Sequence, residues 1–101
     1  MARFPAMYGS PADWLKQRLR DYNSYMANEL PDDVKIILFV NDDGSVSDVW
    51  LNNMPTGSEQ DLAFQNEVRR QVMTMPLWKP ANLNGEPVGT FYTISIKELR
   101  P

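Results

Sequence analysis

The fold of this chain is decided by one stretch, VKIILFVNDDGSVSDVWL, residues 34–51. Two runs rich in β-branched and aromatic residues flank the pair Asp43-Gly44. Because glycine reaches the positive φ of a tight turn without steric cost, an Asp-Gly pair between apolar runs is a strong signal for a β-hairpin. We therefore predict two antiparallel strands within residues 34–51.

The position of the turn also predicts the register of the hairpin. With a two-residue loop at the Asp-Gly pair, apolar residues pair across the strands as Leu38 with Val49 and Ile36 with Leu51. We expect this face to lie on the core. The opposite face receives Ile37, Phe39 and Trp50 and is not purely polar, so we expect it to be partly covered.

Upstream, residues 10–30 carry the pattern of an amphipathic helix. Ser10-Pro11-Ala12-Asp13 offers an N-cap, a proline at the first helical position and an acidic residue that completes a capping box. The apolar residues at helical spacing are Leu15, Leu19, Tyr22, Met26 and Leu30. We predict one packing helix from about residue 11 to residue 28, ended before Pro31.

Downstream of the hairpin, residues 58–75 repeat this pattern. Ser58 and Asp61 give a second capping-box signal. The apolar residues at helical spacing here are Phe64, Val68, Val72 and Met75. We predict a second helix from about residue 59 to residue 74, which stops before Pro76.

The last part of the chain combines turns with one strand. Leu77-Trp78-Lys79-Pro80 cannot continue a helix and is predicted to be extended, and Asn84-Gly85 is a second turn signal. Residues 89–97 alternate large apolar residues with smaller or polar ones, which predicts a final strand. For Trp78 we favour a buried clamp at one end of the core over an exposed recognition site.

Together these elements predict an α+β fold in a single domain, residues 1–101, with a short entry segment at residues 1–9. A three-stranded antiparallel sheet would carry two helices on one face. If the crossover after the second helix is right-handed and skips one strand, the first strand is central and the sheet order is 2-1-3. The strand at residues 89–97 then lies at an edge, with unpaired backbone groups.

The composition excludes several classes of function. The 101 residues contain no cysteine and no histidine, so this chain alone cannot build a disulfide, a zinc site of the usual kind, a cysteine nucleophile or a histidine base. The net charge of −3 without a Lys/Arg cluster argues against nucleic-acid binding. The longest apolar run, residues 36–40, is too short to span a bilayer. We expect a protein that is not an enzyme, needs no cofactor or metal, and makes no membrane contact through these residues.

Two charged groups have functional alternatives. Asp42, Asp43 and Asp48 offer carboxylates for a divalent cation, but no nearby glutamate completes such a site, and we expect these residues to shape a turn. Arg69 and Arg70 could bind an anion, but adjacent helical residues point in different directions, so we expect a solvated helix face.

Several segments of this sequence resemble a known family. The residues concerned are the hairpin, MPLWKPA at residues 75–81, NGEPV at residues 84–88 and the closing strand. In this order, with a helix after the hairpin, they resemble the C-terminal domain of TonB, the periplasmic energy transducer of Gram-negative bacteria, in a Bacteroidetes-like variant. The resemblance covers residues 34–97 well and residues 4–30 loosely.

The resemblance implies a periplasmic module, tethered to the inner membrane by a segment outside these residues. Such a module binds the TonB-box peptide of a TonB-dependent outer-membrane transporter by β-strand addition and couples inner-membrane energy to transport. It uses no cofactor. The implied peptide-binding residues are Phe91, Tyr92, Thr93, Ile94, Ser95, Ile96 and Lys97.

Two alternatives remain open at this stage. One is a structural domain of a TonB-like envelope protein that forms a homodimer through the same open edge or by strand exchange, without a role in energising transport. The other is a small carboxylate-dependent hydrolase, which we do not favour because no acid–base pair with tuned surroundings is visible. The size of the protein in solution distinguishes the peptide-binding module from the dimer.

Overall fold

The hairpin forms in the predicted register. The computed structural model describes all residues, 1–101. β1 (Lys35–Val40) pairs antiparallel with β2 (Val46–Asn52), and the pairs include Ile36 with Leu51 and Leu38 with Val49. Every second residue of β1 is fully buried, because successive side chains of a strand point to opposite faces.

The turn of this hairpin is wider than the predicted two-residue loop. The Asn41 N–H donates to the Ser45 carbonyl at 2.8 Å, so three residues close the loop, and the pairing shifts between Phe39 and Val40. The Asp43 carboxylate accepts bonds from the Ser45 N–H at 2.9 Å and the Ser45 hydroxyl at 2.6 Å, which stabilises the wider loop. Asp43 therefore shapes the turn.

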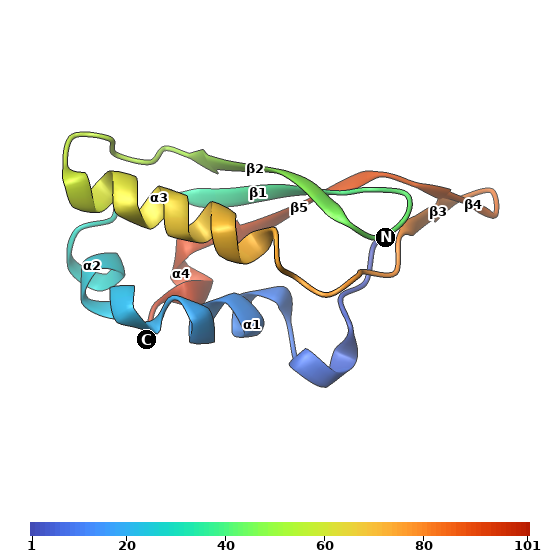
Figure 1. Cartoon of the computed structure of the whole chain (residues 1–101), viewed down its shortest axis with the longest axis horizontal. Helices are drawn as coiled ribbons and strands as arrows, with labels where there is room; N and C mark the ends of the chain where they lie inside the picture. Colours follow the sequence, from blue (N-terminus) through green and yellow to red (C-terminus); the bar gives the residue numbers. More distant parts are fainter.

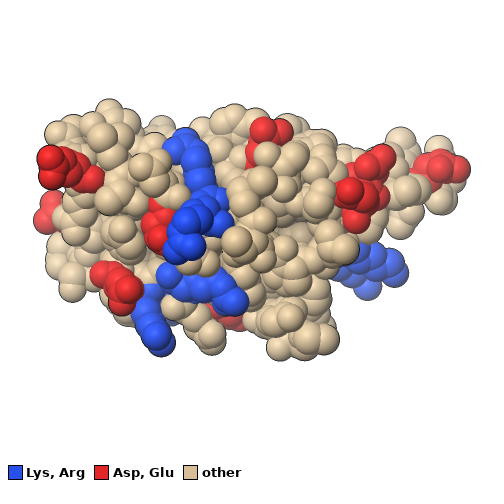
Figure 2. Space-filling model, viewed as in Figure 1, with Lys and Arg blue, Asp and Glu red and all other residues tan.

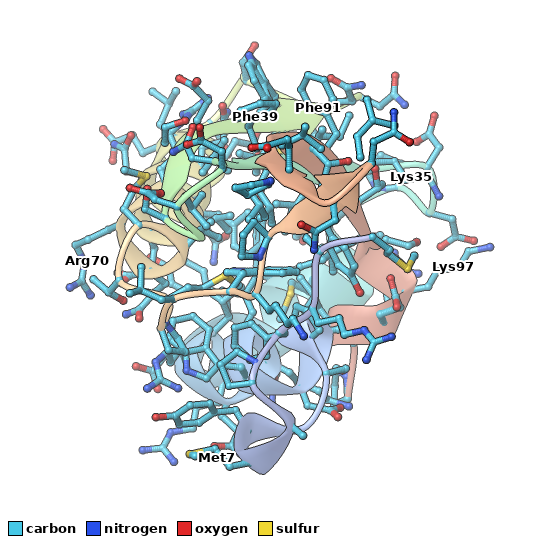
Figure 3. The ribbon with its side chains drawn as sticks, turned by 90° about the vertical axis from the view of Figure 1, so that its right-hand side faces the viewer. Met7, Lys35, Phe39, Arg70, Phe91 and Lys97 are labelled. Carbon is cyan, nitrogen blue, oxygen red and sulfur yellow. The ribbon has the colours of Figure 1, made fainter.

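The third strand completes the sheet on the other side of β1. β5 (Thr90–Ser95) pairs antiparallel with β1, and the order β2-β1-β5 confirms the predicted order 2-1-3. The helices lie together on one face of this sheet, and the opposite face carries side chains but no helix (Figures 1 and 3). The fold is thus α+β, as the order of elements predicts.

The predicted first helix is broken into three segments. The Ser10 capping box forms and starts α1 (Pro11–Arg18), which is followed by η2 (Arg20–Tyr22) and α2 (Asn23–Asn28). The Tyr22 N–H donates to the Leu19 carbonyl at 2.8 Å, three residues back instead of four. Leu19 and Met26, on either side of this tighter turn, both lie fully buried in the core.

The second helix agrees closely with the prediction. α3 (Glu59–Val72) starts at the Ser58 capping box, in which the Asp61 N–H donates to the Ser58 hydroxyl at 3.0 Å. Phe64, Val68 and Val72 are fully buried, as the helical spacing predicts. A single cap and a single apolar stripe are sufficient to position this helix on the sheet.

The segment after α3 contains a short hairpin that the sequence interpretation treated as a loop. β3 (Ala81–Leu83) and β4 (Glu86–Val88) pair antiparallel around the turn at Asn84 and Gly85, both of which have positive φ. The hairpin projects from one end of the molecule (Figure 1). The turn was predicted correctly, but each strand is too short to give an alternating pattern.

The predicted final strand at residues 89–97 is too long at its C-terminal end. β5 ends at Ser95, and Ile96 and Lys97 belong to α4 (Ile96–Leu99). The reason is a third capping box, in which the Ser95 N–H donates to the Glu98 carboxylate at 2.7 Å and the Lys97 N–H donates to the Ser95 hydroxyl at 3.3 Å.

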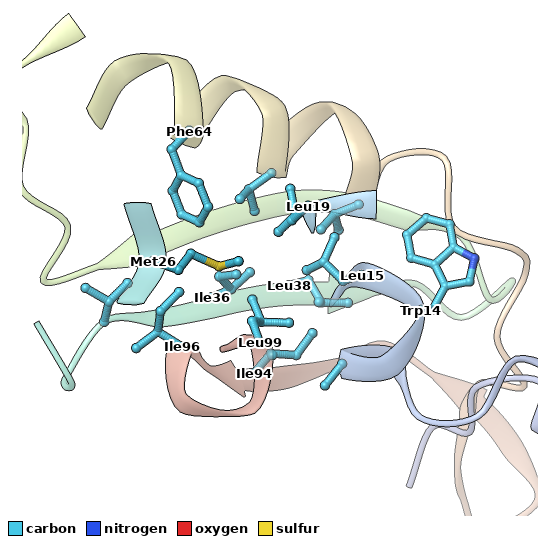
Figure 4. Close-up of a cluster of buried hydrophobic side chains, with 14 of the residues drawn as sticks. Trp14, Leu15, Leu19, Met26, Ile36, Leu38, Phe64, Ile94, Ile96 and Leu99 are labelled. Atoms are coloured by element: carbon cyan, nitrogen blue, oxygen red, sulfur yellow. The ribbon is translucent and has the colours of Figure 1, made fainter. Parts of the chain in front are cut away.

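The core lies between the sheet and the helices (Figure 4). Its fully buried side chains from both layers include Leu15, Leu19, Met26, Ile36, Leu38, Phe64, Ile94, Ile96 and Leu99. Trp78 is only 3% exposed and packs its ring against Phe4 and Tyr92, each at 5.1 Å between ring centroids. The prediction that Trp78 is a core residue is confirmed. None of the helices combines the length and the apolar character needed to cross a membrane.

Candidate functional site

The outer edge of β5 is the candidate site, because β5 pairs with β1 alone. The structure places Phe91, Tyr92, Thr93, Ile94 and Ser95 in this strand. Ile96 and Lys97, the other two residues expected to bind peptide, lie in α4 and not in β5. The candidate edge is therefore Thr90–Ser95.

Backbone geometry identifies which groups of β5 are free. The Ile96 N–H donates to the Val34 carbonyl at 3.0 Å, which fixes a hydrogen-bonded pair at the end of the β1–β5 ladder. Hydrogen-bonded and non-hydrogen-bonded pairs alternate along an antiparallel ladder. The N–H and C=O groups of Phe91, Thr93 and Ser95 consequently point away from β1, toward the open edge.

The two edges of the sheet differ in how well they are protected. β2 carries Asp48 and a register shift against β1, and both charge and bulges are devices that discourage strand addition. β5 pairs with β1 in continuous register, and its sequence, TFYTIS, contains no charged residue and no proline. Of the two edges, β5 is the one open to a further strand.

The side chains of β5 lie on two different faces of the sheet. Ile94 is fully buried, and Tyr92 is half-buried against Trp78, where burial and the charge of Glu98 raise the pKa of the Tyr92 hydroxyl. Phe91 is 62% exposed and lies with Phe39 on the sheet face opposite the helices (Figure 3). This edge is therefore anchored in the core on one side and exposes an aromatic ring on the other.

Phe91 belongs to an aromatic cluster, which we define as Phe39, Trp50 and Phe91. Its ring centroid lies 5.0 Å from that of Phe39 and 5.8 Å from that of Trp50. Trp50 is 43% exposed, whereas Ile37 and Phe39 are half-buried, so this face is partly covered, as predicted. The three rings come from three adjacent strands and pack edge-on or tilted, which holds Phe91 in place beside the open edge.

Sequence reasoning missed Glu98 and the contact between Phe91 and Phe39. The signal for Glu98 was present, because Ser95 and Glu98 have the same spacing as the two capping boxes that were recognised. The contact of Phe39 with Phe91 could not be found from the hairpin alone. It depends on the register between β1 and β5, which are far apart in the sequence.

A hollow lies between α1, η2 and α3. It has a volume of about 490 Å³ and is lined by Arg18, Asp21, Tyr22, Glu67, Arg70 and Gln71. Lys and Arg side chains form a band across this side of the molecule (Figure 2). Arg70 forms an ion pair with Glu67 that lowers the pKa of that carboxyl, and Arg18 stacks 3.8 Å from the Trp14 ring. Arg18 and Arg70, the two arginines that line this hollow, are therefore both engaged by neighbouring side chains.

The chain shows no group of three or more acidic side chains placed to hold a metal ion. No family model, curated protein or solved structure matches the chain. The features of this chain that bear on its function are the open β5 edge and the aromatic ring beside it.

Proposed function

We propose that this chain is a periplasmic peptide-binding module that accepts the TonB-box peptide of an outer-membrane transporter as an additional strand on β5. The observation that carries the proposal is the open edge of β5, which is uncharged and free of proline and of register shifts. An edge of this kind is a template for a further strand, because unpaired N–H and C=O groups regain hydrogen bonds when a partner docks.

Main-chain hydrogen bonds supply most of the affinity in this mode of recognition, and alternate side chains supply the specificity. Phe91 is the main candidate for a specificity contact, because its ring is exposed and held by Phe39. A docked strand would place every second side chain on the same face as Phe91. An apolar residue of the peptide at that position would shield the ring from water.

The partner and the compartment in this proposal come from the resemblance to the TonB C-terminal domain. In this proposal the module transmits energy from the inner membrane to the transporter, acts without a cofactor and catalyses no reaction. The affinity should be modest, because an extended peptide loses conformational freedom when it docks and the contact area is small.

The test is a titration of isotope-labelled protein with a transporter-derived TonB-box peptide, followed by amide chemical shifts. We expect the amides of Phe91 and Thr93 to shift first and to become protected from hydrogen exchange, because their N–H groups face the open edge. Shifts that cluster instead at Val49 and Leu51 would move the binding edge to β2.

A matched peptide separates backbone pairing from side-chain contacts. The same TonB-box peptide with N-methyl groups on alternate amides keeps its side chains but loses the donors that face the protein. We expect this peptide to leave the Phe91 and Thr93 amides unshifted. If it binds as well as the unmodified peptide, strand addition is not the mode of binding. If neither peptide binds and the protein is a dimer, the structural alternative replaces the proposal.

A further inference from the structure

The open edge of β5 ends abruptly at Ser95. The N–H of this residue points away from β1, toward the edge, but it donates to the Glu98 Oε2 atom at 2.7 Å. Ser95 is also the N-cap of α4, and the carbonyl of an N-cap residue accepts the first hydrogen bond of its helix. The N–H group of Ser95 is therefore not available to a docking strand.

The helix that follows Ser95, α4, is firmly anchored in the fold. Ile96 and Leu99 are fully buried. Beyond the helix, the Arg100 side chain donates to the Met26 carbonyl at 3.0 Å and to the Leu30 carbonyl at 2.7 Å, and it forms an ion pair with Asp32. Unwinding α4 to lengthen β5 would displace Leu99 from the core and expose it to water. The end of the edge at Ser95 is thus a fixed feature of the fold.

The other end of the edge is limited by a proline. β4 precedes β5 with only Gly89 between them, and Pro87 lies at the centre of β4. Proline has no N–H, so β4 offers no backbone donor at that position to any strand alongside it. The free donors and acceptors between these two limits within β5 are those of Phe91 and Thr93.

From this geometry we infer that the β5 edge accepts only a short extended segment, whose ladder is confined to Phe91 and Thr93, and that Glu98 is the residue that ends it. This inference rests on the proposed function and specifies the partner further. Where the peptide passes Ser95, its carbonyl finds no backbone N–H to bond, because Glu98 holds that group.

Two substitutions at Glu98 test the inference. Glu98→Ala releases the Ser95 N–H, whereas Glu98→Gln retains an acceptor that can hold it, because glutamine also completes a capping box. We expect Glu98→Ala to bind the TonB-box peptide about 2- to 10-fold more tightly, the effect of one additional hydrogen bond. We also expect the Ser95 amide to join the shifted set. Glu98→Gln should behave as the parent.

A third variant controls for loosening of the helix. Ser95→Ala removes the hydroxyl that accepts from the Lys97 N–H but leaves the backbone N–H at position 95 bonded to Glu98. We expect no gain in affinity from it. If Ser95→Ala gains as much as Glu98→Ala, or if Glu98→Ala gains nothing, the inference is wrong.

Hydrogen exchange in the absence of peptide tests the inference separately from the proposed function. In the parent protein the Ser95 amide should exchange more slowly than those of Phe91 and Thr93, and Glu98→Ala should remove this difference. Equal exchange of the three amides in the parent would overturn the inference. Failure of the parent to bind any TonB-box peptide, with the exchange pattern as expected, would overturn the proposed function and leave the closed end at Ser95 established.

Discussion

Gly44 meets two constraints at the tip of the first hairpin. Its φ of +89° lies in the left-handed region that side chains disfavour. Its carbonyl accepts a hydrogen bond from the Trp78 N–H at 2.9 Å, so the chain after α3 docks directly on this residue. A Cβ atom at position 44 would lie 2.1 Å from the Trp78 carbonyl oxygen, and that oxygen belongs to a backbone that cannot rotate away.

We therefore expect Gly44→Ala to destabilise the protein by at least about 2 kcal/mol, since strain and steric overlap add. Gly57→Ala is the matched control, because nothing lies within 4 Å of a Cβ at that position. It should change stability by less than about 0.5 kcal/mol. The measurement is the urea unfolding midpoint. Equal midpoints for the two variants would contradict the contact between Gly44 and Trp78.

Substitution of Phe91 should weaken peptide binding while changing the stability of the fold little. Because its side chain is 62% exposed, Phe91→Ala should lower stability by no more than about 1 kcal/mol and weaken peptide binding several-fold. Leu62→Ala on α3, at 51% exposure, serves as a control that should leave binding unchanged. Isothermal titration of both variants makes the comparison. Parent-like affinity of Phe91→Ala would exclude Phe91 as a specificity contact.

At the scale of single elements, local signals were sufficient wherever a segment forms from its own residues. The hairpin register follows from alternation and the Asp-Gly pair, and α3 follows from the Ser58 cap and one apolar stripe. The strand order also followed, because the handedness of crossovers leaves few arrangements.

Features imposed by tertiary packing were not predictable in this way. The break after α1 contains no proline or glycine, so no helix-breaking residue marks it in the sequence. The aromatic cluster depends on pairing between distant strands. For the candidate site, the strand and its edge position were predicted, but its end at Ser95 was not, because the alternating pattern of residues 89–97 predicted a strand and the Ser95–Glu98 capping box was missed.

The start of α3 predicts a specific dependence on pH. The Asp61 carboxylate accepts a bond from the Tyr25 hydroxyl, which lowers the pKa of Asp61 below its ordinary value of 3.8, while burial and the same bond raise the pKa of Tyr25. A lowered carboxyl pKa stabilises the fold fully above the ordinary value. That stability is lost as the pH falls from about 3.8 through the lower folded pKa.

Tyr25→Phe should therefore lower the urea midpoint at pH 7 and lose less further stability in acid than the parent loses. Part of the acid sensitivity should remain, because Asp32, Asp43 and Glu67 also have lowered pKa values. Tyr22→Phe, which removes a hydroxyl with no carboxylate partner, is the control and should keep the parent's pH profile. If Tyr25→Phe keeps the parent's dependence of stability on pH, the bond between Tyr25 and Asp61 does not contribute to the acid sensitivity.

At the scale of the whole molecule, Trp78 joins segments that are distant in sequence. Its backbone bonds to Gly44, and its ring contacts Phe4 and Tyr92. Trp78→Ala should cost about 3–5 kcal/mol in the free energy of unfolding. Trp78→Phe should cost less, because the buried indole N–H has no hydrogen-bond partner to lose. An unchanged thermal midpoint for Trp78→Ala would contradict this role.

The expected oligomeric state follows from the short length of strand edge that β5 leaves unpaired. A second copy could pair with β5, but only Phe91 and Thr93 offer free groups, and α4 closes the ladder at Ser95. Stable interfaces bury about 800 Å² on each partner, far more than a ladder of this length provides. We therefore expect a monomer at both low and high micromolar concentration by light scattering, with no change in mass for Phe91→Ala. A dimer that persists on dilution would favour the structural alternative, because it would occupy the edge that the peptide needs.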